Sequence, residues 1–351
     1  MTSANAWHRS RAPVASLDFL QHVVHRHWGF APTLEPLYGE RDLNARLLTP
    51  GGERWLLKLS HPATTRPRLA FEERVFEGLA SQPRSPVTPS PLPARAGSSV
   101  VPVILDSGVR THLRILSWLT GEPLNPAQAP EPALEALGAS CAHLNEALAA
   151  CELAGHDGAL PRDLPWDLQN TRALAALLGS CPPVVPREAV LYTLDRFRAH
   201  VADPLAGLPR QVVHNDLNPD NLRFDPHQPS ALPGVIDFGD MVVAPVICDL
   251  AIACAYLVGE EPDTCLDRVV PVLRGFDRVR PMRTVEWQLL PTLLEARLCQ
   301  SLVIQGVRIS DGHPDANALE QSLSGHARRL RALQESAGDR SRLLKASVRA
   351  C

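Results

Sequence analysis

The stretch Val212–Asp240, VVHNDLNPDNLRFDPHQPSALPGVIDFGD, decides the fold. It contains the pattern His-x-Asp-x-x-x-x-Asn, which runs from His214 through Asp216 to Asn221. Sixteen residues later the triplet Asp-Phe-Gly begins at Asp237. Each piece alone is also a turn signal. Together, at this spacing and between two strand-like runs, they are typical of a site that transfers a phosphoryl group.

Phosphoryl transfer explains why these residue types belong together. One carboxylate must orient the attacking hydroxyl, while hard oxygen ligands hold Mg²⁺ on the phosphates of a nucleotide. Asp216 lies in a loop and suits the role of catalytic base. Asn221 and Asp237 suit the metal, because a hairpin of the strand-like runs Leu222–Phe224 and Gly234–Ile236 would bring them together.

The same reaction needs a cation on the phosphates. The chain has 33 arginines but only two lysines, Lys58 and Lys345. Lys58 falls in a strand-like run, and its compact charge can reach phosphate oxygens. We therefore add it to Asp216 and Asn221 as a catalytic residue, the alternative being a solvated strand lysine. The helix-patterned segment Arg68–Ala80 offers two acidic partners: Glu72, which we prefer on its spacing, and its neighbour Glu73, unless both lie on a solvated helix face.

The composition excludes several other classes. The 351 residues are 45% hydrophobic and 21% charged, as in globular proteins, and the length suggests about two domains. A net charge of −3 gives no basic field for nucleic acid. The longest apolar run, Val246–Val258, is interrupted by Asp249, so we expect no membrane span. The first residues contain no apolar signal region, and the eight cysteines contain no CxxC, so we expect a reduced cytoplasm. The oligomeric state is left undecided.

Hydrophobic periodicity divides the chain into two lobes. The N-terminal part predicts strands and one helix, followed by a Pro/Ser-dense surface loop at Gln82–Pro93. After Pro123 the pattern becomes helical. We therefore expect an α+β fold with a small β-rich N-lobe, residues 1–117, and a larger, mostly helical C-lobe, residues 118–351. The expected strands are Leu37–Leu48, Arg54–Leu59, Val100–Leu105 and His112–Leu116, and the expected C-lobe helices are Glu131–Leu153, Trp166–Leu178, Glu188–Leu205, Ile247–Leu257, Val285–Val307 and Ala316–Leu333.

The motifs HNDLNPDNL and VIDFGD resemble those of the aminoglycoside phosphotransferase/choline kinase family, small-molecule kinases with a two-lobed protein-kinase-like fold. Four stretches are most similar to the hydroxylysine kinase branch: Gly39–Leu47, Leu164–Leu168, Gly234–Met241 and Cys248–Tyr256. The resemblance implies GTP or ATP as donor and the hydroxyl of a small amine or amino acid as acceptor, with 5-hydroxylysine as the leading candidate. Aminoglycoside, choline-like and homoserine-like acceptors are the alternatives. The rivals from other classes are a silent nucleotide-binding module and a regulatory or interaction protein built from the helical lobe.

The resemblance also implies roles for single residues. Asp216 would be the base, and Asn221 and Asp237 would hold Mg²⁺. Lys58 would contact the phosphates, and the loop Tyr38–Asn44 would cover them. That loop has a single glycine, Gly39, so its grip on phosphate would depend on backbone N–H groups and on Asn44.

Three further positions follow from the same resemblance. His214 would support the catalytic loop, and Asp249 would brace the C-lobe. The hinge that binds the base of the nucleotide would fall at Leu116–Leu119, where Trp118 belongs either to the nucleotide site or to the core.

The acceptor is expected to be small. Only twelve residues separate Asp237 from Asp249 and no APE follows, so a peptide-docking segment is absent. An ammonium group on the acceptor would be received by Asp167 or Asp240, and Trp166 could stack on a cation. Asp167 is equally well explained as a helix N-cap, and Asp240 as a turn cap.

Overall fold

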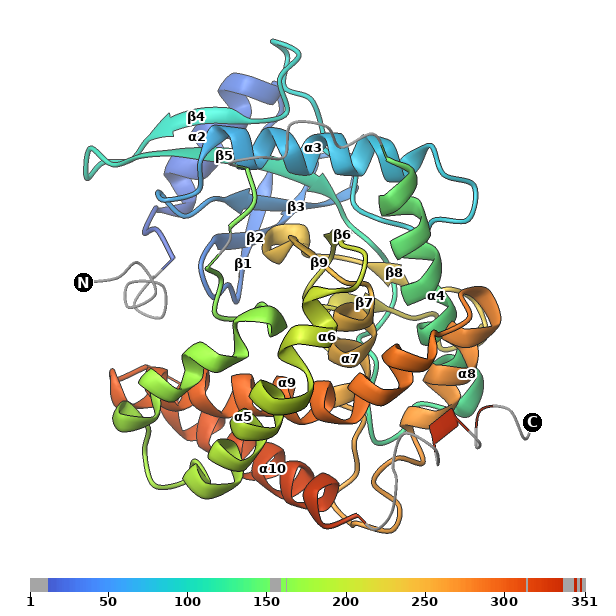
Figure 1. Cartoon of the computed structure of the whole chain (residues 1–351). Helices are drawn as coiled ribbons and strands as arrows, with labels where there is room; N and C mark the ends of the chain where they lie inside the picture. The colour runs from blue at the N-terminus through green and yellow to red at the C-terminus, as the bar shows by residue number, and fades with distance from the viewer. Residues whose placement is uncertain are drawn as a thin grey trace.

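The computed structural model describes residues 12–151, 159–161, 163–313, 315–336, 344–345 and 348. A five-stranded sheet with two helices forms one end of the molecule, and the C-terminal helices form the other (Figure 1). Two short two-stranded sheets lie between these parts. This is the two-lobed, kinase-like α+β architecture that the sequence predicted.

The N-lobe sheet is antiparallel throughout, with strand order β1-β2-β3-β5-β4. Its register sets Lys58 on the central strand, opposite Asn44 on one neighbouring strand and Arg114 on the other. The strands are β1 Thr33–Leu37, β2 Leu43–Leu48, β3 Arg54–Leu59, β4 Val101–Ile104 and β5 Arg110–Ser117. Because they lie directly opposite one another, the side chains of Lys58, Asn44 and Arg114 share one face of the sheet.

The prediction of one strand over Leu37–Leu48 is wrong. The chain reverses between β1 and β2 through residues 38–42, at the segment expected to cover the phosphates. A Cβ atom on Gly39 would lie 2.1 Å from the carbonyl oxygen of Asp42, so the reversal requires glycine. Asn44 then donates to the carbonyl of Tyr38 at 3.3 Å.

The sheet packs on an N-terminal helix that the periodicity did not reveal, α2 Leu17–Trp28. The Ser16 side chain accepts from the backbone N–H of Phe19, and Gly29 ends the helix at a φ of 88°. Residues of α2 form a separate core with the sheet, because alternate residues of β3 point toward it. On the other face of the sheet lies α3 Arg66–Ala80, whose apolar face joins the core of the C-lobe.

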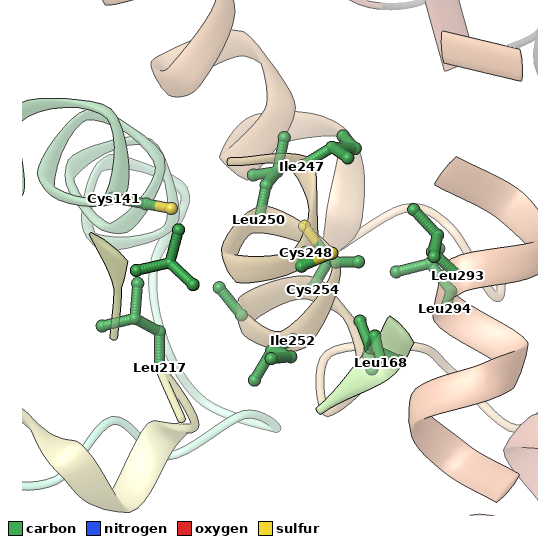
Figure 2. Close-up of a cluster of buried hydrophobic side chains, with 14 of the residues drawn as sticks. Cys141, Leu168, Leu217, Ile247, Cys248, Leu250, Ile252, Cys254, Leu293 and Leu294 are labelled. Carbon is green, nitrogen blue, oxygen red and sulfur yellow. The ribbon is translucent and has the colours of Figure 1, made fainter. Parts of the chain in front are cut away.

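The C-lobe is built around α7 Ile247–Ala255, whose nine residues are all buried. A helix that is apolar on every side belongs at the centre of a helical lobe. Figure 2 shows it between Cys141 of α4 and the pair Leu293 and Leu294 of α9. The other C-lobe helices are α4 Glu131–Ala150, α5 Arg187–His200, α6 Ala202–Ala206, α8 Val269–Val279, α9 Thr284–Ser310 and α10 Ala316–Glu335.

Several predicted helix boundaries need correction. The segment Trp166–Leu178 forms 3₁₀ turns, η1 Leu168–Ala176 and η2 Leu178–Ser180, and Glu188–Leu205 is divided at Val201 into α5 and α6. Helix α8 was not predicted. Helix α4 ends at Ala150, and residues 152–153 of the predicted Glu131–Leu153 helix lie outside the described residues.

Helices α4 and α8 touch through two glycines. A Cβ on Gly138 would lie 1.8 Å from a backbone oxygen of α8, and one on Gly275 would lie 2.0 Å from a backbone oxygen of α4. Only glycine allows two helix backbones to approach this closely. Position 275 belongs to the helix that the periodicity missed.

Two pairs of antiparallel strands carry the motif segments between the lobes, and the second pair is a hairpin. Strand β6 Gln211–Val213 pairs with β9 Val242–Ala244, and β7 Leu222–Arg223 pairs with β8 Gly234–Val235. The Pro/Ser-dense loop touches the second pair, because Val235 donates its N–H to the carbonyl of Val87. Strand β5 ends at Ser117, and we propose the lobe boundary directly after it, at 117/118. Across the described part of the chain, no helix combines the length and apolarity needed to cross a membrane.

Candidate active site

The catalytic loop presents Asp216 next to Asn221. The Asn221 side chain donates to the Asp216 carboxylate Oδ2 at 2.7 Å and to the Asp216 backbone carbonyl at 2.9 Å. The turn η3 Pro219–Asn221 brings the two residues together, and the Asn218 side chain caps it by accepting from the N–H of Asp220. The amide thus holds the carboxylate in one orientation.

A buried carboxylate braces this loop from below. Asp249 accepts the backbone N–H groups of His214 at 3.0 Å and Asn215 at 2.6 Å, and the side-chain amide of Asn145 at 3.1 Å. Burial raises the pKa of Asp249, and the three hydrogen-bond donors oppose the rise. Asn215 has a left-handed φ of 66°. These contacts match the supporting role expected of Asp249.

The histidine of the motif joins the catalytic loop to the Asp-Phe-Gly segment. His214 accepts the N–H of Asp216 at Nδ1, 3.2 Å away, and its Nε2 lies 3.0 Å from the carbonyl of Ile236. The Phe238 ring packs edge-on against His214 at 4.7 Å and against Phe76 of α3 at 5.2 Å. The two motif segments and α3 therefore form one packed unit.

Lys58 lies beside the Asp-Phe-Gly carboxylate. Its Nζ is 3.1 Å from Asp237 Oδ1 and 3.4 Å from Asp42 Oδ2. Burial alone would lower the pKa of Lys58, but these two carboxylates outweigh it and raise it. The Lys58 charge lowers the pKa of Asp237 in turn. The strand lysine and the metal-ligand candidate thus meet, although 179 residues separate them.

The predicted ion pair between Lys58 and Glu72 is not formed. Glu72 pairs instead with Arg114 at 2.7 Å and with Arg68 at 3.3 Å. The register explains this, because Arg114 of β5 lies directly opposite Lys58 and reaches the helix α3 that carries Glu72. Its neighbour Glu73 pairs with Arg66 on its own helix.

Arg68 is a site residue that the sequence analysis missed. Its guanidinium donates to three backbone carbonyls of the Asp-Phe-Gly segment, at Gly239 (2.8 Å), Met241 (3.1 Å) and Phe238 (3.4 Å). The five N–H donors of arginine make such a multiple contact possible. Helix α3 therefore fixes the backbone that presents Asp237.

The β1–β2 loop reaches across to the C-lobe. Glu40, next to Gly39 at the tip, forms an ion pair of 3.0 Å with Arg308 near the end of α9. Burial raises the pKa of Glu40, while the charge of Arg308 opposes the rise. The loop thus contacts the C-lobe through Glu40 and, through Asp42, the lysine that pairs with Asp237. Trp118 follows β5 and is half-buried, which leaves both of its predicted roles open.

The three acceptor candidates have different surroundings. Asp167 is buried and caps η1 by accepting from the Gln169 N–H, so the N-cap alternative is correct for its main contacts. Trp166 does stack on a cation, but that cation is Arg297, 4.7 Å from the ring centroid. Asp240 follows the Asp-Phe-Gly turn, and burial together with the charges of Asp216 and Asp237 raises its pKa to about 7.

Arg297 of α9 was also missed by the sequence analysis. Its guanidinium donates to Asp216 Oδ1 at 2.7 Å, and its side chain is almost completely buried. It lies in a helix that was predicted from apolar spacing alone. An arginine on the buried face of such a helix was the signal that could have marked it.

The donor set suits Mg²⁺. Asn221 and Asp237 offer an amide oxygen and a carboxylate, both hard ligands, and half of the Asp237 side chain remains exposed. Asn221 donates both hydrogen bonds to Asp216, which leaves its carbonyl oxygen to a cation. No group of three or more His, Cys, Asp or Glu side chains that could hold a metal occurs among the described residues. A magnesium ion with few protein ligands relies on the phosphates and water for the remainder.

Comparison with known proteins agrees with this geometry. Residues 33–282 match the model of the phosphotransferase enzyme family. A hydroxylysine kinase of Mus musculus is 24% identical over 323 residues, which cover 87% of this chain and 86% of that protein. A homoserine kinase of Acidiphilium cryptum is 29% identical over 222 residues, covering 62% and 64% of the two chains.

Among solved structures, the amicoumacin kinase hAmiN in complex with AMP-PNP, Ca²⁺ and Ami superposes with a TM-score of 0.69 at 15% identity. The match covers 91% of this chain and 93% of that one, and at this identity it shows the fold. The family model spans well over half of the chain. The protein therefore belongs to the phosphotransferase enzyme family, and its resemblance to the hydroxylysine kinases within that family is confirmed.

Proposed function

We propose that the protein transfers the γ-phosphoryl group of GTP or ATP to the hydroxyl of a small amine or amino acid, with 5-hydroxylysine as the leading acceptor. The observation that carries this proposal is that the pair Lys58–Asp237 and the pair Asn221–Asp216 are joined through the hydrogen bond between the backbones of Ile236 and Asn221. A protein that only binds nucleotide has no use for a fixed carboxylate beside the metal ligands.

The side chains would divide the work as follows. Asp216 accepts the hydrogen of the acceptor hydroxyl and directs its oxygen at the γ-phosphorus. Lys58 holds phosphate oxygens and exchanges its present partner Asp237 for them. Gly39 and Asn44 shape the loop that excludes water, and Trp118 lies where the hinge would meet the base.

Asn221 and Asp237 would hold Mg²⁺ on the nucleotide. When bound, the ion supplies positive charge that offsets the charge on the phosphates. The ion pair between Lys58 and Asp237 keeps that carboxylate charged in the meantime, because Lys58 lowers its pKa.

The acceptor class rests on the named relatives and on the charges around Asp216. Hydroxylysine and homoserine are both amino acids with a side-chain hydroxyl, which places homoserine second. Asp240 lies near enough to Asp216 and Asp237 for their charges to raise its pKa, so an ammonium group would be attracted there. Aminoglycoside or choline-like acceptors would use the same attraction.

The free thiols of the described cysteines suit a reduced cytoplasm, which we propose as the location of the protein.

The test is nucleotide turnover with Mg²⁺ across a panel of 5-hydroxylysine, homoserine, choline and an aminoglycoside, with GTP and ATP in parallel. We expect acceptor-dependent release of GDP or ADP, fastest with 5-hydroxylysine. Turnover only with another acceptor would keep the reaction and replace the substrate. Tight nucleotide binding without any turnover would favour the silent binding module.

Two variants of the same loop give a matched comparison. Asp216→Ala should nearly abolish turnover while nucleotide affinity is preserved, because the base touches the acceptor and not the donor. Asp220→Asn removes an exposed carboxylate four residues away and should leave turnover unchanged. Loss of nucleotide binding in Asp216→Ala would contradict the role that we assign to it.

A further inference from the structure

The contact between Arg297 and Asp216 is the closest ion pair of the base. Arg297 Nη2 donates to Asp216 Oδ1 at 2.7 Å. The Arg297 side chain is 2% exposed and the Asp216 side chain 22%. Among the residues that the structure describes, Arg297 is the one cation within ion-pair distance of this carboxylate.

The Arg297 guanidinium is itself held by further hydrogen bonds and by two aromatic rings. Nε donates to the Tyr256 hydroxyl at 3.1 Å, and Nη1 donates to the Trp166 carbonyl at 3.3 Å. The rings of Trp166 and Tyr256 lie 4.7 Å and 5.7 Å from its central carbon. One turn further along α9, Gln300 donates to the carbonyl of Pro165 and ties the same segment to the helix. The guanidinium therefore cannot turn without breaking several contacts.

The two oxygens of Asp216 are consequently fixed by different elements. Oδ1 accepts from Arg297 of α9, and Oδ2 accepts from Asn221 of the catalytic loop. Each carboxylate oxygen has two lone pairs, so each can still accept one more hydrogen bond from an acceptor hydroxyl. The plane of the carboxylate is thus set before any substrate arrives.

We propose that Arg297 is the positioning residue of the base: clamped by Trp166 and Tyr256, it holds the Asp216 carboxylate in the orientation that receives the acceptor hydroxyl. This inference rests on the proposed function. The guanidinium contacts two aromatic rings and has a hydrogen-bond partner at each of its three nitrogens, so it acts on the acceptor through Asp216 and not by direct contact. The same contact explains why Trp166, which was predicted to stack on a cation of the substrate, stacks on Arg297 instead.

The test compares Arg297→Met and Arg297→Lys with Arg196→Met and Arg196→Lys. Arg196 also pairs with a buried carboxylate of α9, Glu295, at 2.8 Å, but has no contact with Asp216. For each variant we would measure kcat, the acceptor KM, nucleotide affinity and the slow hydrolysis of nucleotide without acceptor. Hydrolysis matters because water attack also needs an oriented base and does not involve the acceptor.

Arg297→Met should lower kcat and the acceptor-free hydrolysis about 100-fold, the cost typical of a reacting group displaced by about 1 Å. The acceptor KM and nucleotide affinity should stay within about threefold of the wild type. Arg297→Lys keeps the charge but cannot span the three partners, so it should lose about tenfold in kcat. Both Arg196 variants should keep the wild-type kcat. If Arg297→Met does not fold, Arg297→Lys carries the comparison.

Three results would overturn the inference. Unchanged kcat in both Arg297 variants would show that the clamp is only structural. A raised acceptor KM with unchanged kcat and hydrolysis would make Arg297 a substrate-binding residue. A wild-type protein that turns over no acceptor and hydrolyses no nucleotide would overturn the proposed function, and this inference with it.

Discussion

The hydrogen bonds that Asp249 accepts from the catalytic loop can be disrupted with Asp249→Asn, which replaces one carboxylate oxygen by an NH₂ group. The Asp249 carboxylate accepts three hydrogen bonds and is fully buried. An asparagine oxygen can keep the two bonds at Oδ2, from His214 and Asn145. Its NH₂ group then faces the backbone N–H of Asn215, which is left without an acceptor.

The magnitude follows from this count. A buried N–H without a partner costs about 1–3 kcal/mol, and the loss of charge assistance in the two remaining bonds costs about 1 kcal/mol more. Removing a buried carboxylate offsets part of this, since burial already raises the pKa of Asp249. We expect the free energy of unfolding to fall by about 2 kcal/mol. Asn215, which holds a φ of 66°, can then relax, and kcat should fall about tenfold or more because Asp216 follows it directly.

Urea unfolding and steady-state turnover measure the two effects separately. Glu295→Gln is the matched control, because Glu295 is also fully buried and accepts from Arg196 and Thr193, away from the loop. It should lose similar stability and keep its kcat. If Asp249→Asn retains kcat within twofold, or both variants lose kcat equally, then Asp249 does not hold the loop for catalysis.

Three shorter predictions concern other parts of the molecule. Gly138→Ala should lower the free energy of unfolding in urea by about 2–3 kcal/mol, since its Cβ would lie 1.8 Å from a backbone oxygen of α8. In Gly325→Ala the nearest atom would lie 3.7 Å away, so the free energy of unfolding should stay the same or rise by up to about 1 kcal/mol; equal effects would contradict the packing argument. Glu40→Gln should raise the KM for nucleotide or acceptor about two- to fivefold, and adding Arg308→Gln should have no further effect, whereas additive losses in this double-mutant cycle would show that the pair does not hold the loop. Burial lowers the pKa of His326 to about 4 in the folded protein, so as the pH falls below 6.5 the unfolded chain takes up the proton first. About 3 kcal/mol of stability should therefore be lost between pH 6.5 and 4. His326→Phe should lack this part of the pH dependence, which unfolding at several pH values would reveal.

The motif segments could be predicted because their chemistry is local. Asp216 and Asn221 are five residues apart on one loop, so their contact depends on a single turn and survives any error in the surrounding fold. The strand β3 could be predicted from its alternating buried residues and the helix α3 from its 3.6-residue apolar spacing. Lys58 stood out only because the chain otherwise uses arginine.

Other elements could not be predicted from a short window. Helix α8 carries Pro271 and Gly275 and owes its place to a glycine contact with α4. The 3₁₀ turns at Leu168–Ala176 have apolar spacing that is also compatible with an α-helix. Tertiary packing, which periodicity does not report, decided both cases.

The error at Glu72 shows where sequence reasoning about a site stops. The prediction paired Lys58 with Glu72, or with its neighbour Glu73, and preferred Glu72 on its spacing in the helix. Each instead has its own partners: Lys58 lies between Asp42 and Asp237, and Glu72 lies between Arg68 and Arg114.

Strand register decides this exchange, because it sets Arg114 opposite Lys58 and within reach of α3. In a chain with 33 arginines, no residue count could single out that one. The consequence is functional: Glu72 fixes Arg68, which holds the backbone of the Asp-Phe-Gly segment, and Lys58 remains next to Asp237, where the phosphates are expected. The arrangement therefore separates the residue that would bind phosphate from the charges that hold α3 in place, so Glu72→Gln should weaken the packing of α3 more than it weakens the contact of Lys58 with nucleotide.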